Sequence, residues 1–223
     1  MAASAFRPPL TLTGRYVELV PLSTAHRVPL RYAARDPEVR KYLRRGPGET
    51  LSDLDALIAL LLEAQSAGTD LPFTVLRLPD RRPVGMTRYL RIAREDRAVE
   101  IGGTWIDSEV WRTPINTESK LLLLRHAFER ENVHRVQLQT DSRNERSQRA
   151  IERLGAVREA VLREDVLLPG PYYRSSVIYS ILEGEWPGVK RRLETFLARP
   201  WPPENAVPGT APAPGSAPEE GAP

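Results

Sequence analysis

The chain has 223 residues, 41% of them hydrophobic, which is enough for a packed core in one large domain or two small ones. It contains no cysteine, which excludes disulfides, thiolate catalysis and cysteine metal sites. The formal net charge is +3, with basic and acidic residues interleaved and 7% aromatic residues, which argues against a nucleic-acid-binding surface.

The three histidines are far apart and show no ligand spacing, so we expect no metal site. No apolar run reaches the roughly 18 residues of a membrane span. The N-terminus also lacks a compact apolar signal core. These features predict a cytoplasmic protein that does not associate with membranes.

The first half of the chain alternates helical and strand-like segments. An amphipathic pattern over residues 51–67 stops at Gly68, as a helix does, and a proline-flanked turn at 79–83 separates two β-rich runs. In order, we predict a strand at 15–21, helices at 23–34, 37–43 and 51–67, and strands at 73–78, 84–92 and 98–106.

The second half has a strand, helix, strand, helix, strand order. Residues 135–141 alternate strictly, which predicts a strand with one buried face. Ser142 and Glu145 have capping-box spacing, and Gly155 ends the helix that they begin. The predicted elements are a helix at 114–131, a strand at 135–141, that capped helix, a hairpin of 157–168 and 173–182 around the turn at 169–171, and a helix near 186–197.

We find no internal repeat and no linker before residue 198, so residues 1–197 are predicted to form a single domain. Eight of the 21 prolines follow, in a segment of Ala, Pro, Gly and Glu with little to bury. We expect this 198–223 tail to be disordered and dispensable for folding and activity. The element order predicts a mixed α and β fold.

The junction at residues 99–120 is the most informative segment. Gly102 and Gly103 interrupt a β-rich run and leave its backbone uncovered for a bulge or a ligand. Thr113 and Pro114 then begin a helix whose N-terminal amides and dipole favour an anion, with Arg112 beside them. The alternative is an ordinary strand-to-helix turn with a solvated arginine.

The chain resembles the GNAT superfamily of acetyl-CoA-dependent N-acetyltransferases, in its RimJ/RimL-like branch of ribosomal-protein N-terminal acetyltransferases. The resemblance covers residues 12–186 and is specific as an ordered set rather than motif by motif. Its carriers are Val99-Glu100-Ile101-Gly102, the 111–120 junction, His134-Arg135-Val136, Asn144-Glu145-Arg146-Ser147 and Leu154-Gly155-Ala156.

The resemblance implies an α+β GNAT fold: a mixed, mostly antiparallel sheet of about six to seven strands with a splayed parallel pair at the cofactor site. It also implies acetyl-CoA as the acyl donor. The family's glycine-rich pyrophosphate loop is altered here, because Ile115 and Thr117 replace its glycines. The segment is similar to an Arg-Thr-x-x-Asn-Thr-Glu-x-Lys variant, in which Thr113, Asn116 and Thr117 supplement the backbone donors.

Acetyl transfer from a thioester requires a neutral amine, and Glu100 is the candidate base at a position where the family often has an acid. The alternative is a surface glutamate, or one paired with an arginine. Many relatives supply a tyrosine to the leaving thiolate, but Ile151 stands at that position. Ser147 is our candidate for this contact, and the alternative is a small residue that lets the helix pack. Asn144 either contacts the pantetheine arm or caps its helix.

The resemblance further implies that the pantetheine arm lies between the strands at 98–106 and 135–141, with an amide near Trp105 or Ile106 polarising the thioester carbonyl. Trp111 flanks the cofactor or belongs to the core, and His126 and His134 are taken as structural. Acceptor specificity is assigned to residues 32–49 and 169–173, where no code is readable.

Two classes of function remain open. The first is an active N-acetyltransferase acting on a peptide N-terminus or a small-molecule amine. The second is a weak or inactive GNAT-fold protein that binds acetyl-CoA as a regulatory or interaction module. A homodimer is compatible with either class. A hydrolase or kinase is disfavoured, because no G-x-S-x-G and no Walker A sequence is present.

Overall fold

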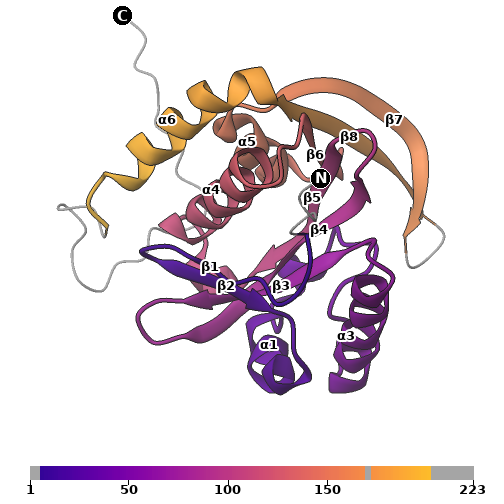
Figure 1. The fold of residues 1–223 in the computed structure, drawn as a ribbon. Coiled ribbons are helices and arrows are strands. Elements are labelled where there is room, and N and C mark those ends of the chain that lie inside the picture. The colour runs from indigo at the N-terminus through magenta and orange to yellow at the C-terminus, as the bar shows by residue number, and fades with distance from the viewer. Residues whose placement is uncertain (1–5, 169–171, 202–223) are drawn as a thin grey trace, which may run out of the picture.

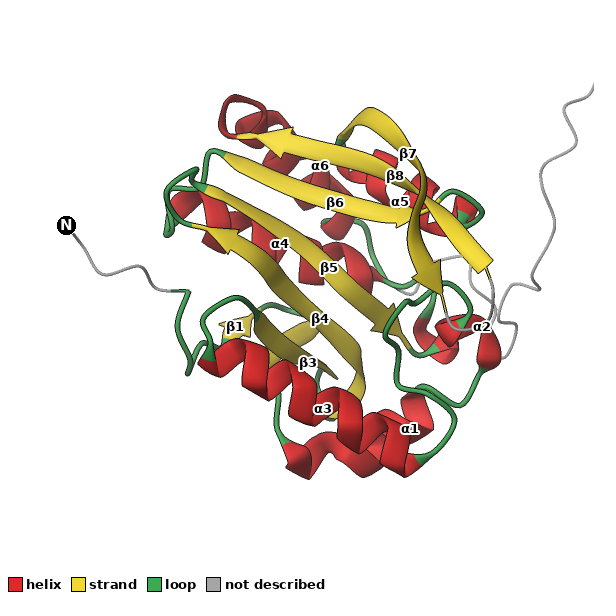
Figure 2. Ribbon diagram, turned by 90° about the vertical axis from the view of Figure 1, so that its right-hand side faces the viewer, coloured by secondary structure: helices red, strands yellow, loops and turns green. Residues whose placement is uncertain are grey.

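A computed structural model describes residues 6–168 and 172–201 of the protein. These residues form an eight-stranded sheet in the order β1-β2-β3-β4-β5-β6-β8-β7. Among these strands, only β5 and β6 pair in parallel. Helices α4, α5 and α6 cover one face of the sheet, while α1 and α3 lie on the other (Figures 1 and 2). The predicted fold class is confirmed, with eight strands where about six to seven were expected.

The first half of the chain contributes an antiparallel run of strands and three helices. The missed strand is β1, which is only two residues long. In order, the elements are β1 (Leu12–Thr13), β2 (Val17–Pro21), η1 (Thr24–His26), α1 (Arg27–Ala33), α2 (Pro37–Arg40), α3 (Leu51–Ser66), β3 (Leu71–Arg77), β4 (Arg82–Ala93) and β5 (Ala98–Ile106).

The second half follows the predicted order of strands and helices. The strand predicted at residues 135–141 is found with those bounds. In order, the elements are η2 (Ser108–Val110), α4 (Pro114–Glu129), β6 (Arg135–Asp141), α5 (Glu145–Leu154), β7 (Val157–Leu168), β8 (Tyr172–Leu182), η3 (Glu183–Glu185) and α6 (Trp186–Leu197). The predicted turn at 169–171 and most of the predicted 198–223 tail lie outside the described residues.

Local sequence signals explain several helix ends. Thr50 and Asp53 form a reciprocal capping box at the start of α3. Gly155 ends α5 in the left-handed region at φ 100°, as predicted. The predicted capping box at Ser142 is wrong, because the N-cap of α5 is Asn144, whose side chain accepts from the Ser147 amide. Asn144 is as good a cap as serine and lies closer to the helix start.

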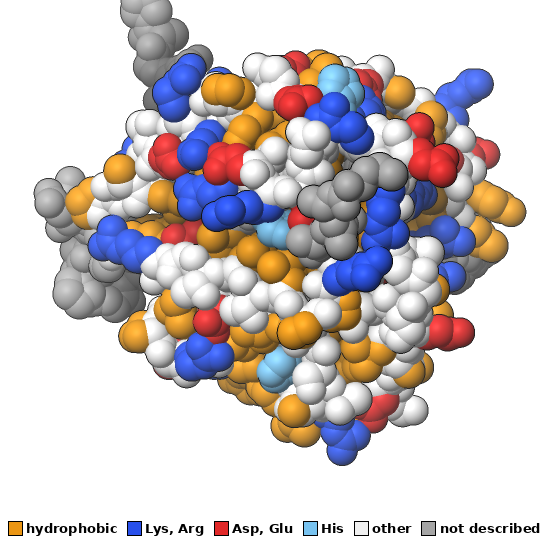
Figure 3. Space-filling model, viewed as in Figure 1, with side chains coloured by type: hydrophobic (Ala, Val, Ile, Leu, Met, Phe, Trp, Pro, Cys, Tyr) orange, Lys and Arg blue, Asp and Glu red, His pale blue; other side chains and the backbone are white. Residues whose placement is uncertain are grey.

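Buried side chains form two clusters. The larger one lies between the sheet and α4, α5 and α6, and the smaller one joins α1, α2 and α3 to Met86 and Trp105. Within residues 6–168 and 172–201, none of the helices has the length and apolar character that a membrane span requires. On the face shown in Figure 3, basic and acidic side chains are interspersed rather than gathered into one basic patch.

Candidate active site

Strands β5 and β6 separate soon after they pair. Their parallel ladder joins Ala98, Val99 and Glu100 to the three residues 135–137, while β5 continues to Ile106 and β6 to Asp141 (Figure 2). The rest of β6 pairs only with β8. Backbone groups on the β6 side of β5 beyond Glu100 therefore have no strand partner, and they can bind an extended ligand. This is the divergence that the resemblance implied.

The direction of the β5 amides follows from one hydrogen bond at its end. The amide of Asp107 donates to the carbonyl of Val84 on β4 at 2.7 Å. Because successive amides of a strand point to opposite sides, the Trp105 amide also points toward β4 and the Ile106 amide points into the divergence. The Ile106 carbonyl agrees with this direction, since it accepts from the Trp111 indole at 2.8 Å instead of from β4.

A β-bulge lies between these amides and Glu100. Gly103 has φ 57°, and the β4–β5 register shifts between Met86 and Arg88. Glycine favours this backbone angle, and a Cβ here would lie 2.8 Å from the Nε of Arg88, whose side chain would have to shift. The bulge that Gly102 and Gly103 predicted is confirmed.

Glu100 is 2% exposed in the middle of the sheet, where the two strands separate. Its Oε2 lies 3.2 Å from the Nη1 of Arg91, which is 64% exposed, and it accepts from the Gln137 amide at 3.4 Å. Burial raises the pKa of Glu100, while Arg91 and Arg88 oppose the rise. A carboxylate with a raised pKa is a stronger base than an ordinary one. The arginine-paired glutamate of the alternative interpretation is thus also present in the geometry.

Helix α4 begins beyond the carboxyl end of β5, at the end of the sheet where β5 and β6 separate (Figure 2). Thr113 is its N-cap and accepts from the Ile115 amide at 3.3 Å, and Pro114 is the first helical residue. Arg112 is exposed, has φ 61°, and makes no ion pair or side-chain hydrogen bond with any residue that the structure describes. Pro114 has no amide hydrogen and the Ile115 amide is bonded to Thr113, so the free guanidinium of Arg112 is the clearest anion-binding group at this helix start.

Asn116 and Thr117 occupy different surroundings. Asn116 is half-buried and has no side-chain partner among the described residues. Thr117 is buried, and its hydroxyl accepts from Arg153 Nη2 on α5 at 3.3 Å. The hydroxyl of Thr113, the third predicted donor, donates to the Val110 carbonyl at 2.7 Å. Of the three, Asn116 is thus the one whose side-chain polar atoms remain available.

Glu118 was not identified from the sequence. Its carboxylate accepts from the backbone amides of Arg15, Tyr16 and Val17, at 2.8, 2.6 and 2.8 Å. Gly14 packs directly against it, since a Cβ there would lie 2.4 Å from the Glu118 Cδ. The glutamate of the Asn-Thr-Glu-x-Lys pattern therefore anchors β2 and the turn before it to α4.

Lys120 was also not identified. It is 6% exposed, and its Nζ donates to the Thr104 hydroxyl at 2.6 Å. The Thr104 hydroxyl in turn lies 2.8 Å from the Thr87 hydroxyl. Burial alone lowers its pKa to about 7 from an ordinary value of 10.5. The lysine of the same pattern is therefore buried between α4 and strands β4 and β5, and within the described residues it has no ion-pair partner.

This burial predicts a pH dependence of stability. Between about pH 7 and 10.5 the folded protein binds fewer protons than the unfolded chain, so stability is expected to rise with pH over that range. Lys120→Met should abolish the rise and stabilise the fold at pH 7 by roughly 1–3 kcal/mol. Urea unfolding at several pH values measures both effects. Lys190→Met, which removes an ion-paired lysine on α6, is the control and should keep the slope.

Helix α5 carries the remaining predicted residues. Ser147 lies in its first turn, half-buried, with no hydroxyl partner among the described residues, whereas the Asn144 side chain is engaged in capping. Ile151 belongs to the core.

Trp111, before α4, packs against both core clusters, and the Arg146 guanidinium lies 3.4 Å over its ring.

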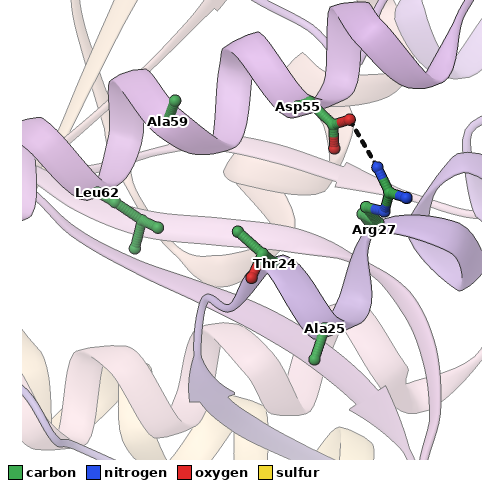
Figure 4. Close-up of a pocket in the computed structure, with 6 residues that line it drawn as sticks. All are labelled: Thr24, Ala25, Arg27, Asp55, Ala59 and Leu62. Carbon is green, nitrogen blue, oxygen red and sulfur yellow. Dashed lines mark hydrogen bonds and ion pairs between the residues drawn. The ribbon is translucent and has the colours of Figure 1, made fainter.

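A pocket of about 550 Å³ lies away from these residues, between η1 and α3 (Figure 4). Arg27 and Asp55 close one end of it with an ion pair of 2.8 Å, and Ala59 and Leu62 line the other. It contains none of the predicted site residues.

His126 is buried against Tyr89 and Phe6, which agrees with the structural role predicted for it.

Comparison with known proteins agrees with this geometry. The family described as "Acetyltransferase (GNAT) domain" matches residues 17–157. "Putative ribosomal N-acetyltransferase YdaF" from Bacillus subtilis (strain 168) is 32% identical over 106 residues, 48% of this chain and 57% of that protein. The chain thus matches little more than half the length of this curated relative.

Solved structures cover more of the chain. One titled "putative acetyltransferase", from T. thermophilus, is 41% identical, with a TM-score of 0.78 over 85% of this chain and 97% of that one. Mycobacterium smegmatis RimJ, in complex with CoA-disulfide, shares the fold at 20% identity, with a TM-score of 0.74 over 85% and 95%. Two of these names, ribosomal N-acetyltransferase YdaF and RimJ, agree with the RimJ/RimL-like branch. From its sequence match and its fold, the chain belongs to the GNAT acetyltransferase family.

Proposed function

We propose that this protein is an acetyl-CoA-dependent N-acetyltransferase that acts on a primary amine, either a peptide N-terminus or a small-molecule amine. The observation that carries the proposal is the buried Glu100 at the point where β5 and β6 separate. A base, an open strand edge and a free helix N-terminus occur on the same unit of β5, α4 and β6. These are the parts that acyl transfer from a long anionic thioester requires.

The residues present suit acetyl-CoA as donor, which supplies the acetyl thioester. Arg112 and the side chain of Asn116, at the start of α4, would hold its pyrophosphate. The Thr113 and Thr117 hydroxyls already have partners in the fold. The open edge of β5 would bind the pantetheine arm, with Asn144 nearby. The Ile106 amide is the better candidate for the thioester carbonyl, because the Trp105 amide points toward β4.

In the proposed reaction Glu100 accepts a proton from the acceptor ammonium, directly or through water. The amine nitrogen then bonds to the acetyl carbon and the carbon–sulfur bond breaks. The thiolate takes up the second proton that the nitrogen loses as it becomes an amide, with Ser147 as the hydroxyl that stabilises it. No covalent enzyme intermediate is required, because donor and acceptor are bound together.

Two measurements test the function. Calorimetry with acetyl-CoA should give saturable binding, and a thiol assay of coenzyme A release should respond to one class of amine or peptide. Tight acetyl-CoA binding with no coenzyme A release for any acceptor would favour a regulatory module. This outcome is worth testing because Ile151 stands where many relatives have the tyrosine that serves the leaving thiolate. Absence of acetyl-CoA binding contradicts both.

Arg112→Ala is expected to weaken acetyl-CoA binding by roughly 1.5–3 kcal/mol, because a charge-assisted contact to phosphate is lost. Arg112→Gly is the matched variant, since glycine relieves the positive φ at this position and should raise stability by about 1 kcal/mol while losing the same affinity. Calorimetry and thermal melts separate the two effects. If both variants retain wild-type affinity, and Asn116→Ala is also silent, the pyrophosphate is not at this helix start.

A further inference from the structure

The edge strand β7 is open to solvent along most of its length. It is the last strand of the described sheet, where it pairs with β8 on one side, and it lies on the outside of the molecule in Figure 1. Residues 157–165 are all exposed, and among them Val157, Val161 and Leu162 are 50%, 43% and 45% exposed. A long exposed edge that carries apolar side chains is a template for pairing with another strand.

Two β-bulges leave a short regular stretch in the middle of this edge. The register between β7 and β8 shifts between Arg158 and Ala160, and again between Leu162 and Val166. Between the two shifts, residues 160–162 pair regularly with residues 176–178 of β8. Bulges bend an edge strand and limit pairing beside them, so this central stretch is the part of β7 best suited to accept a further strand.

The sequence of β7 is self-complementary about the middle of this stretch. If two copies of β7 pair antiparallel about a twofold axis at Val161, each residue meets the one at the same distance on the other side of Val161. The pairs are Arg158 with Glu164, Glu159 with Arg163, Ala160 with Leu162, and Val161 with its own copy. Opposite charges therefore meet in the flanks, and apolar side chains meet at the centre.

Neighbouring registers lack this match. An axis half a residue to either side of Val161 would place Arg158 opposite Arg163, or Glu159 opposite Glu164. An axis one residue later would place Glu159 opposite Asp165, and an axis one residue earlier would place both charged residues 158–159 opposite apolar ones. Like charges directly opposite each other destabilise an antiparallel pair. Of these registers, the one centred on Val161 alone pairs each charge with its opposite.

The charged side chains in the flanks are available for such pairs. Arg158, Arg163 and Glu164 are exposed, and their side chains make no ion pair or hydrogen bond with a residue that the structure describes. Glu159 is bound to Arg135 at 2.5 Å, so it would share its carboxylate between that residue and Arg163 of the second copy. The pair of Arg158 with Glu164 thus joins two groups that are free in the single chain.

We propose that β7 pairs antiparallel with β7 of a second copy of this chain, about a twofold axis at Val161, and that the two sheets join into one continuous sheet in a homodimer. Strands β6 and β8 separate this edge from Glu100 on β5. The proposal therefore concerns a surface apart from the proposed catalytic residues, and it does not depend on the activity.

Sedimentation equilibrium of the full chain, from low to high micromolar concentration, should show a reversible equilibrium between monomer and dimer. Arg158→Glu places like charges opposite each other at two symmetry-related positions, and should weaken dimerisation by about tenfold or more. Glu164→Arg should do the same. The double variant Arg158→Glu/Glu164→Arg restores opposite charges and should recover most of the lost affinity. Val161→Lys, which brings two ammonium groups together at the axis, should also weaken the dimer.

Arg191→Glu on α6 is the matched control, because it reverses an exposed charge away from β7 and should leave dimerisation unchanged. Circular dichroism checks that every variant is folded. A wild-type chain that stays monomeric, an equal loss in the α6 control, or a double variant that dimerises no better than the single ones overturns the inference. Calorimetry with acetyl-CoA on the same samples shows separately whether the proposed function has failed.

Discussion

Glu100→Gln is expected to lower kcat/KM by roughly 10²–10⁴ while leaving acetyl-CoA affinity unchanged, because the amide has the same shape and cannot accept a proton. Part of the loss should be recovered at high pH, where more of the acceptor amine is already neutral. The pH dependence of kcat/KM for the best acceptor measures this. A variant with near wild-type rates at every pH would show that Glu100 is not the base and that proximity alone acts on a minor neutral-amine population.

The same substitution has a second expected consequence, on stability. Burial raises the pKa of Glu100, so the folded protein binds more protons than the unfolded chain near that pKa, and the ionised form is a cost to folding above it. Glu100→Gln should therefore raise Tm by a few degrees at pH 7, since about 1 kcal/mol shifts Tm by about 2–4 °C in a chain of this size. Ser147→Ala is the comparison variant for activity. It should lower mainly kcat, and by a smaller factor than Glu100→Gln lowers kcat/KM.

Glu118→Ala is expected to destabilise the fold by roughly 3–5 kcal/mol, because three backbone amides lose a charged acceptor at once. Thermal or urea unfolding measures it. Glu194→Ala on α6 is the matched control: it removes an exposed ion pair with Arg125, and is expected to cost less than about 1 kcal/mol.

Gly14→Ala provides an independent check on Glu118. The added methyl would overlap the Glu118 carboxylate, so this small change in a turn should destabilise the protein in the same way. Its effect should also shrink when combined with Glu118→Ala, because residues in contact are not additive. Full additivity of the two changes would contradict the anchoring role.

Elements with a strong local signal could be predicted from the sequence. The strict alternation of residues 135–141 and the Thr113-Pro114 helix start depend on neighbouring residues only, and both are found as predicted. The two-residue β1 could not be predicted, because it exists only through pairing with β2. The α5 cap was misplaced by two residues because Ser142 and Asn144 both precede the helix with suitable side chains.

Glu100 and Arg112 could be singled out as site candidates from their residue types and their places in a predicted strand and before a predicted helix, and their roles remain predictions. The contacts of Glu118 and Lys120 could not be predicted, because their partners lie elsewhere in the sequence. Glu118 binds the amide of Arg15, and Lys120 binds the hydroxyl of Thr104.

The short ladder between β5 and β6 has a mechanical consequence. In the described sheet, only three residue pairs join the half made of β1 to β5 to the half made of β6, β8 and β7. A ligand arm bonded to the open edge of β5 would act as an added strand and extend the contact between the two halves. Its binding energy would then resist local opening of one half against the other, so the occupied protein would unfold as a more cooperative unit than the free one.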